Sequence, residues 1–261
     1  MHENIEEMAQ QLRDNWQADS HMDSFPEASS NIDIDTAYQV QDRFRELLGT
    51  KTCGWKIAAT NVAGQRHIDV SHPLAGRLFV DRVYDTPAKL LLRNNRMLVA
   101  EGEFAFRLSN DISPGNSELS REQVMDQVDG LFPAIEIPDS RFINFASAGA
   151  ARLVADNACG REFVLGDEVT GQWREIALDR FEVRMIKNGQ LFLQGTGADV
   201  LGDPRDALTW LVNMCRSRGV SLQAGEIITT GVVGAPVPIA AGDNVIADFG
   251  VLGKVIVSFG D

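Results

Sequence analysis

The pattern of hydrophobic and polar positions predicts two amphipathic helices at the start of the chain. In the first, hydrophobic side chains recur at intervals of three and four residues, which is the spacing of one helix face. These are Ile5, Met8, Leu12 and Trp16. A second hydrophobic stripe covers residues 37–48, with Asp35 as its expected N-cap and Gly49 at the position of a C-terminal cap. We therefore expect residues 1–52 to form an N-terminal helical region.

From residue 53 onward the hydrophobic period approaches two, which is typical of β-strands. Short hydrophobic runs alternate with Gly, Pro, Asn and Asp, and Asn188-Gly189 lies between two such runs, as in a tight β-hairpin. Two further hydrophobic runs end the chain, from Asp243 to Phe249 and from Lys254 to Phe259. Residues 53–261 are therefore expected to form a β-rich core.

Two helices interrupt these strands. Ser120 with Gln123 forms a capping box, and Asp203-Pro204 is a typical helix start. Strands and helices do not alternate often enough for a barrel of βα units or a doubly wound sheet. The fold class expected is α+β, with a mixed and mostly antiparallel sheet.

Composition and charge narrow the function. The chain has 261 residues, of which 44% are hydrophobic, so it can form a substantial core and is not disordered overall. Its net charge of −13 disfavours nucleic acid and anionic membranes as partners. The three cysteines lack the C-x-x-C spacing of a zinc site, and no stretch approaches the ~20 hydrophobic residues of a membrane span. We expect a cytoplasmic protein.

Two glutamates in the segment Val99–Phe106 are candidates for chemistry. On a strand, Glu101 and Glu103 point to the same face with Cα atoms ~6.5–7 Å apart. Most such pairs belong to a solvated strand face, and that reading stays open for an isolated E-x-E pattern.

Glu136 adds a third carboxylate. It lies in the hydrophobic run LFPAIEIP, where a glutamate is expected to be buried and to need a cation or several hydrogen-bond donors. Three carboxylates without histidine or cysteine favour Mg²⁺ or Mn²⁺, and they leave about three of six octahedral positions for water or substrate. The expected site is therefore an open one, of the catalytic type.

Several motifs in order along the chain resemble the fumarylacetoacetate hydrolase superfamily, in particular its branch of 2-keto-4-pentenoate hydratases and 4-oxalocrotonate decarboxylases. The motifs are Gly54-Trp-Lys56-Ile, Gly76-Arg-Leu-Phe79, Glu101-Gly-Glu103, Pro133-Ala-Ile-Glu136, Asp139-Ser-Arg141, Val154-Ala-Asp-Asn157, Leu201-Gly-Asp-Pro204 and Gly225-Glu-Ile-Ile-Thr-Thr-Gly231. The resemblance implies the mixed β-roll core of the family's C-terminal domain over residues 53–261.

The resemblance also implies roles for individual residues. Glu101, Glu103 and Glu136 match the family's three metal-ligand positions, and Lys56 matches a lysine that the hydratases place near the substrate. Burial beside a metal would lower the pKa of such a lysine toward neutrality and suit it for proton transfer. From the residue alone, Lys56 is equally an exposed lysine at the end of a strand.

Three more residues are candidates for substrate binding. Thr230-Gly231 matches a turn that presents a hydroxyl and a backbone N–H to a substrate carboxylate, although alone it is merely a strand-end turn. Arg141 could bind a second carboxylate, but a structural role tying a loop to an acidic side chain is favoured.

One segment departs from the family pattern. The pentenoate hydratases usually have an acidic residue where this chain has Leu74, in the segment His72-Pro-Leu-Ala-Gly76. Leucine cannot transfer a proton. Either His72 serves as the proton carrier, or the substrate and reaction differ from those of the named hydratases.

The activity expected is a hydratase (lyase) that adds water to a 2-hydroxydienoate such as 2-hydroxypenta-2,4-dienoate, in the catabolism of aromatic meta-cleavage products. The cofactor would be Mg²⁺ or Mn²⁺, acting as a Lewis acid on a small 2-oxo acid. A decarboxylase or C–C hydrolase of a related 2-oxo acid is the second hypothesis, and a catalytically degraded ligand-binding protein is the third. A homo-oligomer is expected.

Overall fold

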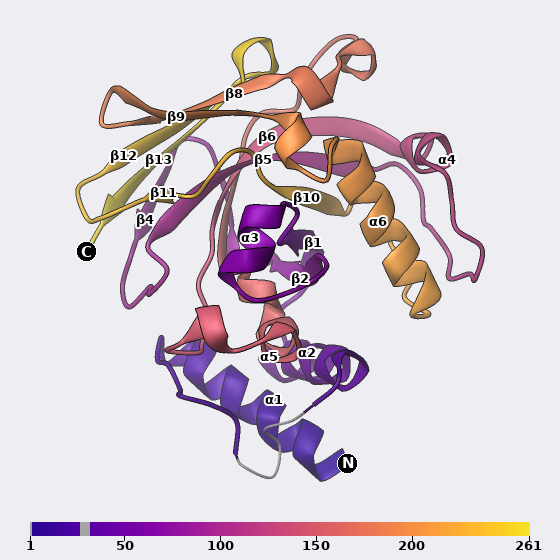
Figure 1. Cartoon of the computed structure of the whole chain (residues 1–261), viewed down its shortest axis with the longest axis vertical. Helices are drawn as coiled ribbons and strands as arrows, with labels where there is room; N and C mark the ends of the chain where they lie inside the picture. Colours follow the sequence, from indigo (N-terminus) through magenta and orange to yellow (C-terminus); the bar gives the residue numbers. More distant parts are fainter. Residues whose placement is uncertain (1, 27–31) are drawn as a thin grey trace.

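The predicted N-terminal helices are α1 (His2–Gln17) and α2 (Ile34–Leu48). The computed structural model describes residues 2–26 and 32–261. In this structure the two helices form a layer at one end of the molecule, and the sheets occupy the other end (Figure 1). The short helix α5 (Ala150–Ala155) packs beside α2 and joins this layer from a distant part of the sequence.

The ends of α2 are fixed by local hydrogen bonds and backbone conformation. The expected C-terminal cap is confirmed, because Gly49 adopts the left-handed conformation with φ 66°. The expected N-cap is wrong by two residues. Asp33, not Asp35, accepts the hydrogen bond from the backbone N–H of Thr36, and Asp35 lies within the first turn, where its charge suits the helix dipole.

The N-terminal helices share a hydrophobic core with the sheets. Trp16 on α1 packs edge-on against Phe44 of α2 and against Phe79 on the adjoining sheet, with ring centroids 5.6 and 5.5 Å apart. Strand β1 (Thr52–Ala58) begins next to the expected boundary between helical region and core. The helical layer therefore supports the sheet from below in the view of Figure 1.

The core contains two sheets that curl toward each other (Figure 1). The larger one has eight strands in the order β2-β1-β10-β5-β6-β7-β3, with β11 paired to β5, and the smaller has five strands in the order β4-β13-β12-β8-β9. Only β1–β10, β3–β7 and β4–β13 pair in parallel among the described strands, so the expected mixed, mostly antiparallel α+β class is confirmed. The remaining strands are β2 Leu74–Phe79, β3 Val83–Asp85, β4 Ala88–Leu91, β5 Val99–Leu108, β6 Val128–Ile137, β7 Glu162–Leu165, β8 Glu182–Lys187, β9 Gln190–Thr196, β10 Ile227–Val232, β11 Val237–Pro238, β12 Asn244–Asp248 and β13 Lys254–Gly260.

The turn and cap motifs in the core are confirmed. Asn188 and Gly189 form the turn between β8 and β9, with φ 51° and 77°. The Ser120 capping box starts α4 (Arg121–Met125), and Asp203 caps α6 (Pro204–Ser217). Helix α3 (Val62–His67) was not predicted, because its six residues present no buried hydrophobic stripe. Among the described residues, no helix combines the length and hydrophobicity that a membrane span requires.

Candidate metal and substrate site

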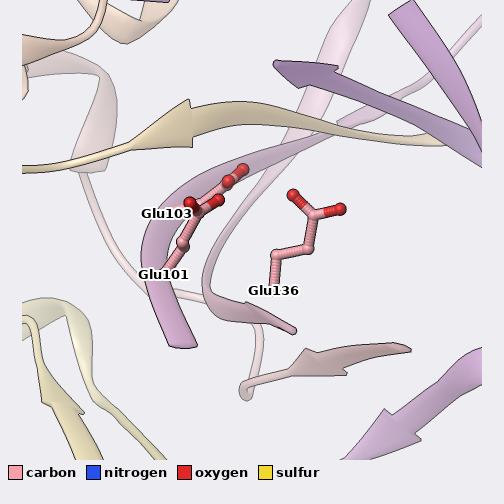
Figure 2. A group of neighbouring side chains, drawn as sticks. All are labelled: Glu101, Glu103 and Glu136. Atoms are coloured by element: carbon pink, nitrogen blue, oxygen red, sulfur yellow. The ribbon is translucent and has the colours of Figure 1, made fainter. Parts of the chain in front are cut away.

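Three glutamates converge where the central strands β5 and β6 pair. Glu101 on β5 lies directly opposite Glu136 on β6, and Glu103 follows two residues later on the same face of β5. Carboxylate oxygens from the three residues lie within 4.8 Å of one another, and Figure 2 shows the three side chains pointing to a common space. One cation could therefore contact all three. The expected convergence is present in the structure, and metal binding stays a prediction.

The three carboxylates carry more negative charge than the protein around them neutralises. Glu103 and Glu136 are 0% and 1% exposed, and Glu101 is partly exposed. Burial and the charge of Glu136 raise the pKa of Glu101 to about 7, and burial with two neighbouring carboxylates raises the pKa of Glu103. Burial also raises the pKa of Glu136, although Lys56 opposes this. Three carboxylates against one ammonium leave an excess of two negative charges, which matches one divalent cation.

Glu103 is held so that one of its oxygens is available. Its Oε2 accepts a hydrogen bond from the Thr229 hydroxyl and another, of 2.8 Å, from the backbone N–H of Gly231. Its Oε1 is buried and has no hydrogen-bond partner, as is also true of Oε1 of Glu136. Buried carboxylate oxygens without a donor are costly unless a cation occupies the site. The donor set therefore fits an oxygen-bound divalent ion.

Lys56 is buried rather than exposed, so the reading of it as a solvated lysine is wrong. Its side chain is 2% exposed, and Nζ lies 3.1 Å from Oε2 of Glu136 and donates a 2.9 Å hydrogen bond to the carbonyl of Ala158. Burial alone would lower the pKa of Lys56, but the three glutamates outweigh it and raise that pKa. This direction is opposite to the expected lowering toward neutrality.

The carbonyl that binds Lys56 belongs to an unusual turn, η4 (Asn157–Cys159). All three of its residues have positive φ, of 55°, 49° and 61°. The Asn157 side chain stabilises the turn, because its Oδ1 accepts from the backbone N–H of Arg77 and its Nδ2 donates to the Arg77 carbonyl, at 2.6 and 3.0 Å. Gly76 lies so close that an added Cβ would be 2.1 Å from the Asn157 carbonyl oxygen. Asn157 therefore has a structural role in this turn.

A cavity of about 420 Å³ opens beside these groups. Lys56 and Glu101 line it, together with Thr60, which the sequence analysis did not single out as a site residue. Thr60 is 2% exposed, and its hydroxyl has no hydrogen-bond partner. It lies against Gly231, where an added Cβ would be 2.0 Å from the Thr60 hydroxyl oxygen. An unpaired buried hydroxyl in a cavity wall is a candidate donor to a ligand.

The structure does not bring every predicted site residue to this cavity. The Thr230 hydroxyl donates to the carbonyl of Phe104 at 2.9 Å, and Gly231 binds Glu103 rather than the cavity space. His72 is exposed, with its ring 3.1 Å from the carbonyl of Pro73, and it is not part of the cavity wall. Leu74 does line the wall and is buried.

Arg141 also lies outside the cavity wall. It is 1% exposed, and its guanidinium pairs with Asp139 and lies 5.1 Å from the ring centre of Trp16. Its backbone N–H donates to Asp156 at 2.7 Å. This geometry corresponds to the structural role that the sequence analysis favoured, since the side chain ties the segment after β6 to the helical layer.

Comparison with known proteins gives consistent matches. A 2-hydroxyhexa-2,4-dienoate hydratase of Comamonas testosteroni is 34% identical over 228 residues, which cover 85% of this chain and 83% of that protein. A 2-keto-4-pentenoate hydratase of Paraburkholderia xenovorans (strain LB400) is 30% identical over 241 residues, with 91% and 88% coverage.

A solved structure shares nearly the whole fold. The 4-oxalocrotonate decarboxylase from Pseudomonas putida G7, complexed with magnesium and adipate, superimposes with a TM-score of 0.89 at 26% identity, covering 99% of this chain and 98% of that one. Residues 64–258 match the sequence pattern of the family described as fumarylacetoacetate (FAA) hydrolase C-terminal. The expected β-roll core is therefore confirmed, and the chain belongs to the fumarylacetoacetate hydrolase family.

Proposed function

We propose that this protein is a divalent-metal-dependent hydratase that adds water to a 2-hydroxydienoate, in the catabolism of aromatic meta-cleavage products. One observation carries the proposal: three converging carboxylates and a buried lysine lie at the wall of a cavity of ligand size. The hydratases among its relatives support the same reaction class.

We assign metal binding to Glu101, Glu103 and Glu136. A bound Mg²⁺ or Mn²⁺ would withdraw electrons from a 2-oxo acid and stabilise its enolate. Solved relatives were complexed with magnesium and with calcium, which supports use of a divalent ion. Thr229 and Gly231 would act as positioning residues, because their hydrogen bonds occupy one oxygen of Glu103 and leave the other without a donor and available to a cation.

Lys56 is the proposed proton carrier. It is the one amine in the wall of the cavity among the described residues, whereas His72 lies outside that wall. The Ala158 carbonyl and Glu136 fix the position of Nζ, so the ammonium can exchange a proton with a substrate carbon in the cavity. Thr60 is proposed to donate its unpaired hydroxyl to a carboxylate or oxo oxygen of the substrate.

A decarboxylase of a related 2-oxo acid is the second candidate, because the solved decarboxylase covers 99% of this chain. Purified protein with Mg²⁺ would be tested against 2-hydroxydienoates and their dicarboxylic analogues by ultraviolet absorbance, with mass spectrometry of the products. Addition of water would support the hydratase, and loss of CO₂ would replace it with the decarboxylase. A homo-oligomeric, cytoplasmic enzyme stays a prediction.

A further inference from the structure

The wall of the cavity is unequal in polarity. Its polar and charged side chains are those of Lys56, Thr60, Asn61, His67 and Glu101, and most of the rest of the wall is hydrophobic. The alternation of β5 explains part of this arrangement, because Val99 shares the face of Glu101 and lies one repeat, ~7 Å, farther from Glu103. The hydrophobic part is formed by Ile68, Met97, Val99, Pro138, Phe145 and Leu153.

No cation is available in this hydrophobic part. Among the described residues of the wall, Lys56 is the only lysine and there is no arginine. Its Nζ already contacts Glu136 and the Ala158 carbonyl. The one imidazole of the wall, His67, is exposed on α3 and lies edge-on to Phe145, with ring centroids 6.0 Å apart. Asn61 is uncharged, and its Oδ1 accepts a hydrogen bond from the backbone N–H of Gly64 at the start of α3. A second carboxylate buried among the hydrophobic side chains would therefore lose its hydration without gaining a cationic partner.

We infer that the cavity selects 2-oxo acids whose distal end is an uncharged alkyl chain, and that it discriminates against dicarboxylic 2-oxo acids. This inference rests on the proposed function, because it assumes that the carboxylate and oxo group lie at the Glu101 end. The cavity volume of about 420 Å³ equals that of about fourteen water molecules at ~30 Å³ each. It therefore accommodates alkyl chains longer than that of a pentenoate.

Matched saturated 2-oxo acids test the selectivity by binding alone. Isothermal calorimetry with Mg²⁺-loaded protein would compare 2-oxobutanoate, 2-oxopentanoate, 2-oxohexanoate and 2-oxohexanedioate. Each added methylene is expected to tighten binding roughly 4-fold. The dicarboxylate is expected to bind at least about 10²-fold more weakly than 2-oxohexanoate, which has the same number of carbons.

A charge-inserting variant tests which part of the wall is responsible. Met97→Lys places an ammonium in the hydrophobic part on a side chain of similar length. The ratio of affinities for 2-oxohexanoate and 2-oxohexanedioate should then shift toward 2-oxohexanedioate by at least about 10-fold. Leu191→Lys adds the same charge on β9, where the side chain is 59% exposed and does not line the cavity, and should leave the preference unchanged. Thermal melting checks that both variants fold. If either does not fold, the wild-type comparison of the four acids still tests the inference.

The outcomes separate this inference from the proposed function. Equal or tighter wild-type binding of 2-oxohexanedioate overturns the inference, as does dicarboxylate binding that is lost in His67→Ala. Binding of 2-oxohexanoate without hydration of any 2-hydroxydienoate overturns the proposed function and leaves the selectivity intact. Failure of all four acids to bind the Mg²⁺-loaded protein overturns both.

Discussion

At Glu103, the two carboxylate oxygens have different surroundings. Oε2 accepts hydrogen bonds from Thr229 and Gly231, and Oε1 accepts none. A glutamine at this position keeps the shape but cannot supply an anionic ligand. We expect Glu103→Gln to weaken Mg²⁺ binding, measured by calorimetry, and hydratase activity by roughly 10²-fold or more. The ion-free variant should melt no lower than the wild type, because one of three repelling carboxylates is gone.

The same change at an exposed position is the control for this variant. Glu118 lies on the surface, and Glu118→Gln should leave both metal affinity and activity unchanged. Full turnover by Glu103→Gln at limiting Mg²⁺ would rule out the ligand role.

In contrast to Glu103→Gln, removal of the Lys56 ammonium should not weaken Mg²⁺ binding. Lys56→Met approximately keeps the length of the side chain and removes the ammonium that pairs with Glu136. We expect kcat to fall by roughly 10²–10⁴-fold, while Mg²⁺ affinity stays equal or increases because the competing cation is gone. Lys56→Arg should not restore kcat, since a guanidinium does not release a proton near neutral pH. Near wild-type kcat in the arginine variant would reduce Lys56 to a fixed charge.

Burial changes the expected stability of these lysine variants. An exposed lysine could be removed at little cost, but Lys56 is 2% exposed and pairs with a buried carboxylate. Its loss leaves Glu136 uncompensated and should lower the free energy of ion-free unfolding by about 3–5 kcal/mol. Saturating Mg²⁺ should recover most of this loss, which denaturant titration with and without the ion would measure.

At the scale of elements, hydrophobic periodicity predicted the long helices and the strand that carries two of the glutamates. Helices α1, α2 and α6 each bury a stripe, and β5 presents Glu101 and Glu103 on one face. Helices α3 and α5 have six residues each, which is too short for a periodic pattern to stand out. Their positions follow from tertiary packing, which a local pattern does not contain.

The site was predictable only in part for the same reason. Alternation along β5 placed two carboxylates together, but their approach to Glu136 depends on the register between β5 and β6. The position of Thr60 depends on contact with Gly231 on β10, more than a hundred residues away in sequence. The resemblance to a family identified Lys56, although the local pattern could not distinguish a buried lysine from an exposed one.

The turn η4 contacts both the Lys56 side chain and strand β2, and the Asn157 side chain stabilises this turn. Asn157→Ala removes three side-chain hydrogen bonds to the backbone of Arg77 and Gly160. It also places alanine in a left-handed backbone conformation, which asparagine tolerates better. We expect a loss of about 2–4 kcal/mol in unfolding free energy and a lower kcat, because the Ala158 carbonyl no longer fixes Lys56. The exposed Asn116→Ala is the control, and an unchanged kcat in Asn157→Ala would separate the turn from catalysis.

At the scale of the whole molecule, the fold brings several negative charges together near the hydrophobic core, where their repulsion lowers the stability of the folded state. The two central strands of the larger sheet place three glutamates, of which Glu103 and Glu136 are fully buried, beside the hydrophobic residues that form the core. Such an arrangement is unfavourable for an ion-free protein and favourable for one that holds a cation. Stability, protonation and metal binding are therefore expected to be coupled.

This coupling predicts a dependence on pH with a defined sign. The pKa values of all three glutamates are raised, that of Glu101 from 4.5 to about 7, so between these values the ion-free folded protein binds more protons than the unfolded chain. Its stability should therefore decrease as pH rises through this window. Mg²⁺ must displace the same protons, so its affinity should increase with pH through this window, by roughly 10-fold per unit for each proton released. Melting temperatures with and without Mg²⁺, from about pH 5.5 to about pH 8, should show a stabilisation by the ion that is small in acid and large above neutrality.

An increase in melting temperature that is the same at every pH would mean that the ion binds elsewhere. Glu101→Gln should flatten the dependence, because it removes the group whose pKa lies at the upper end of the window.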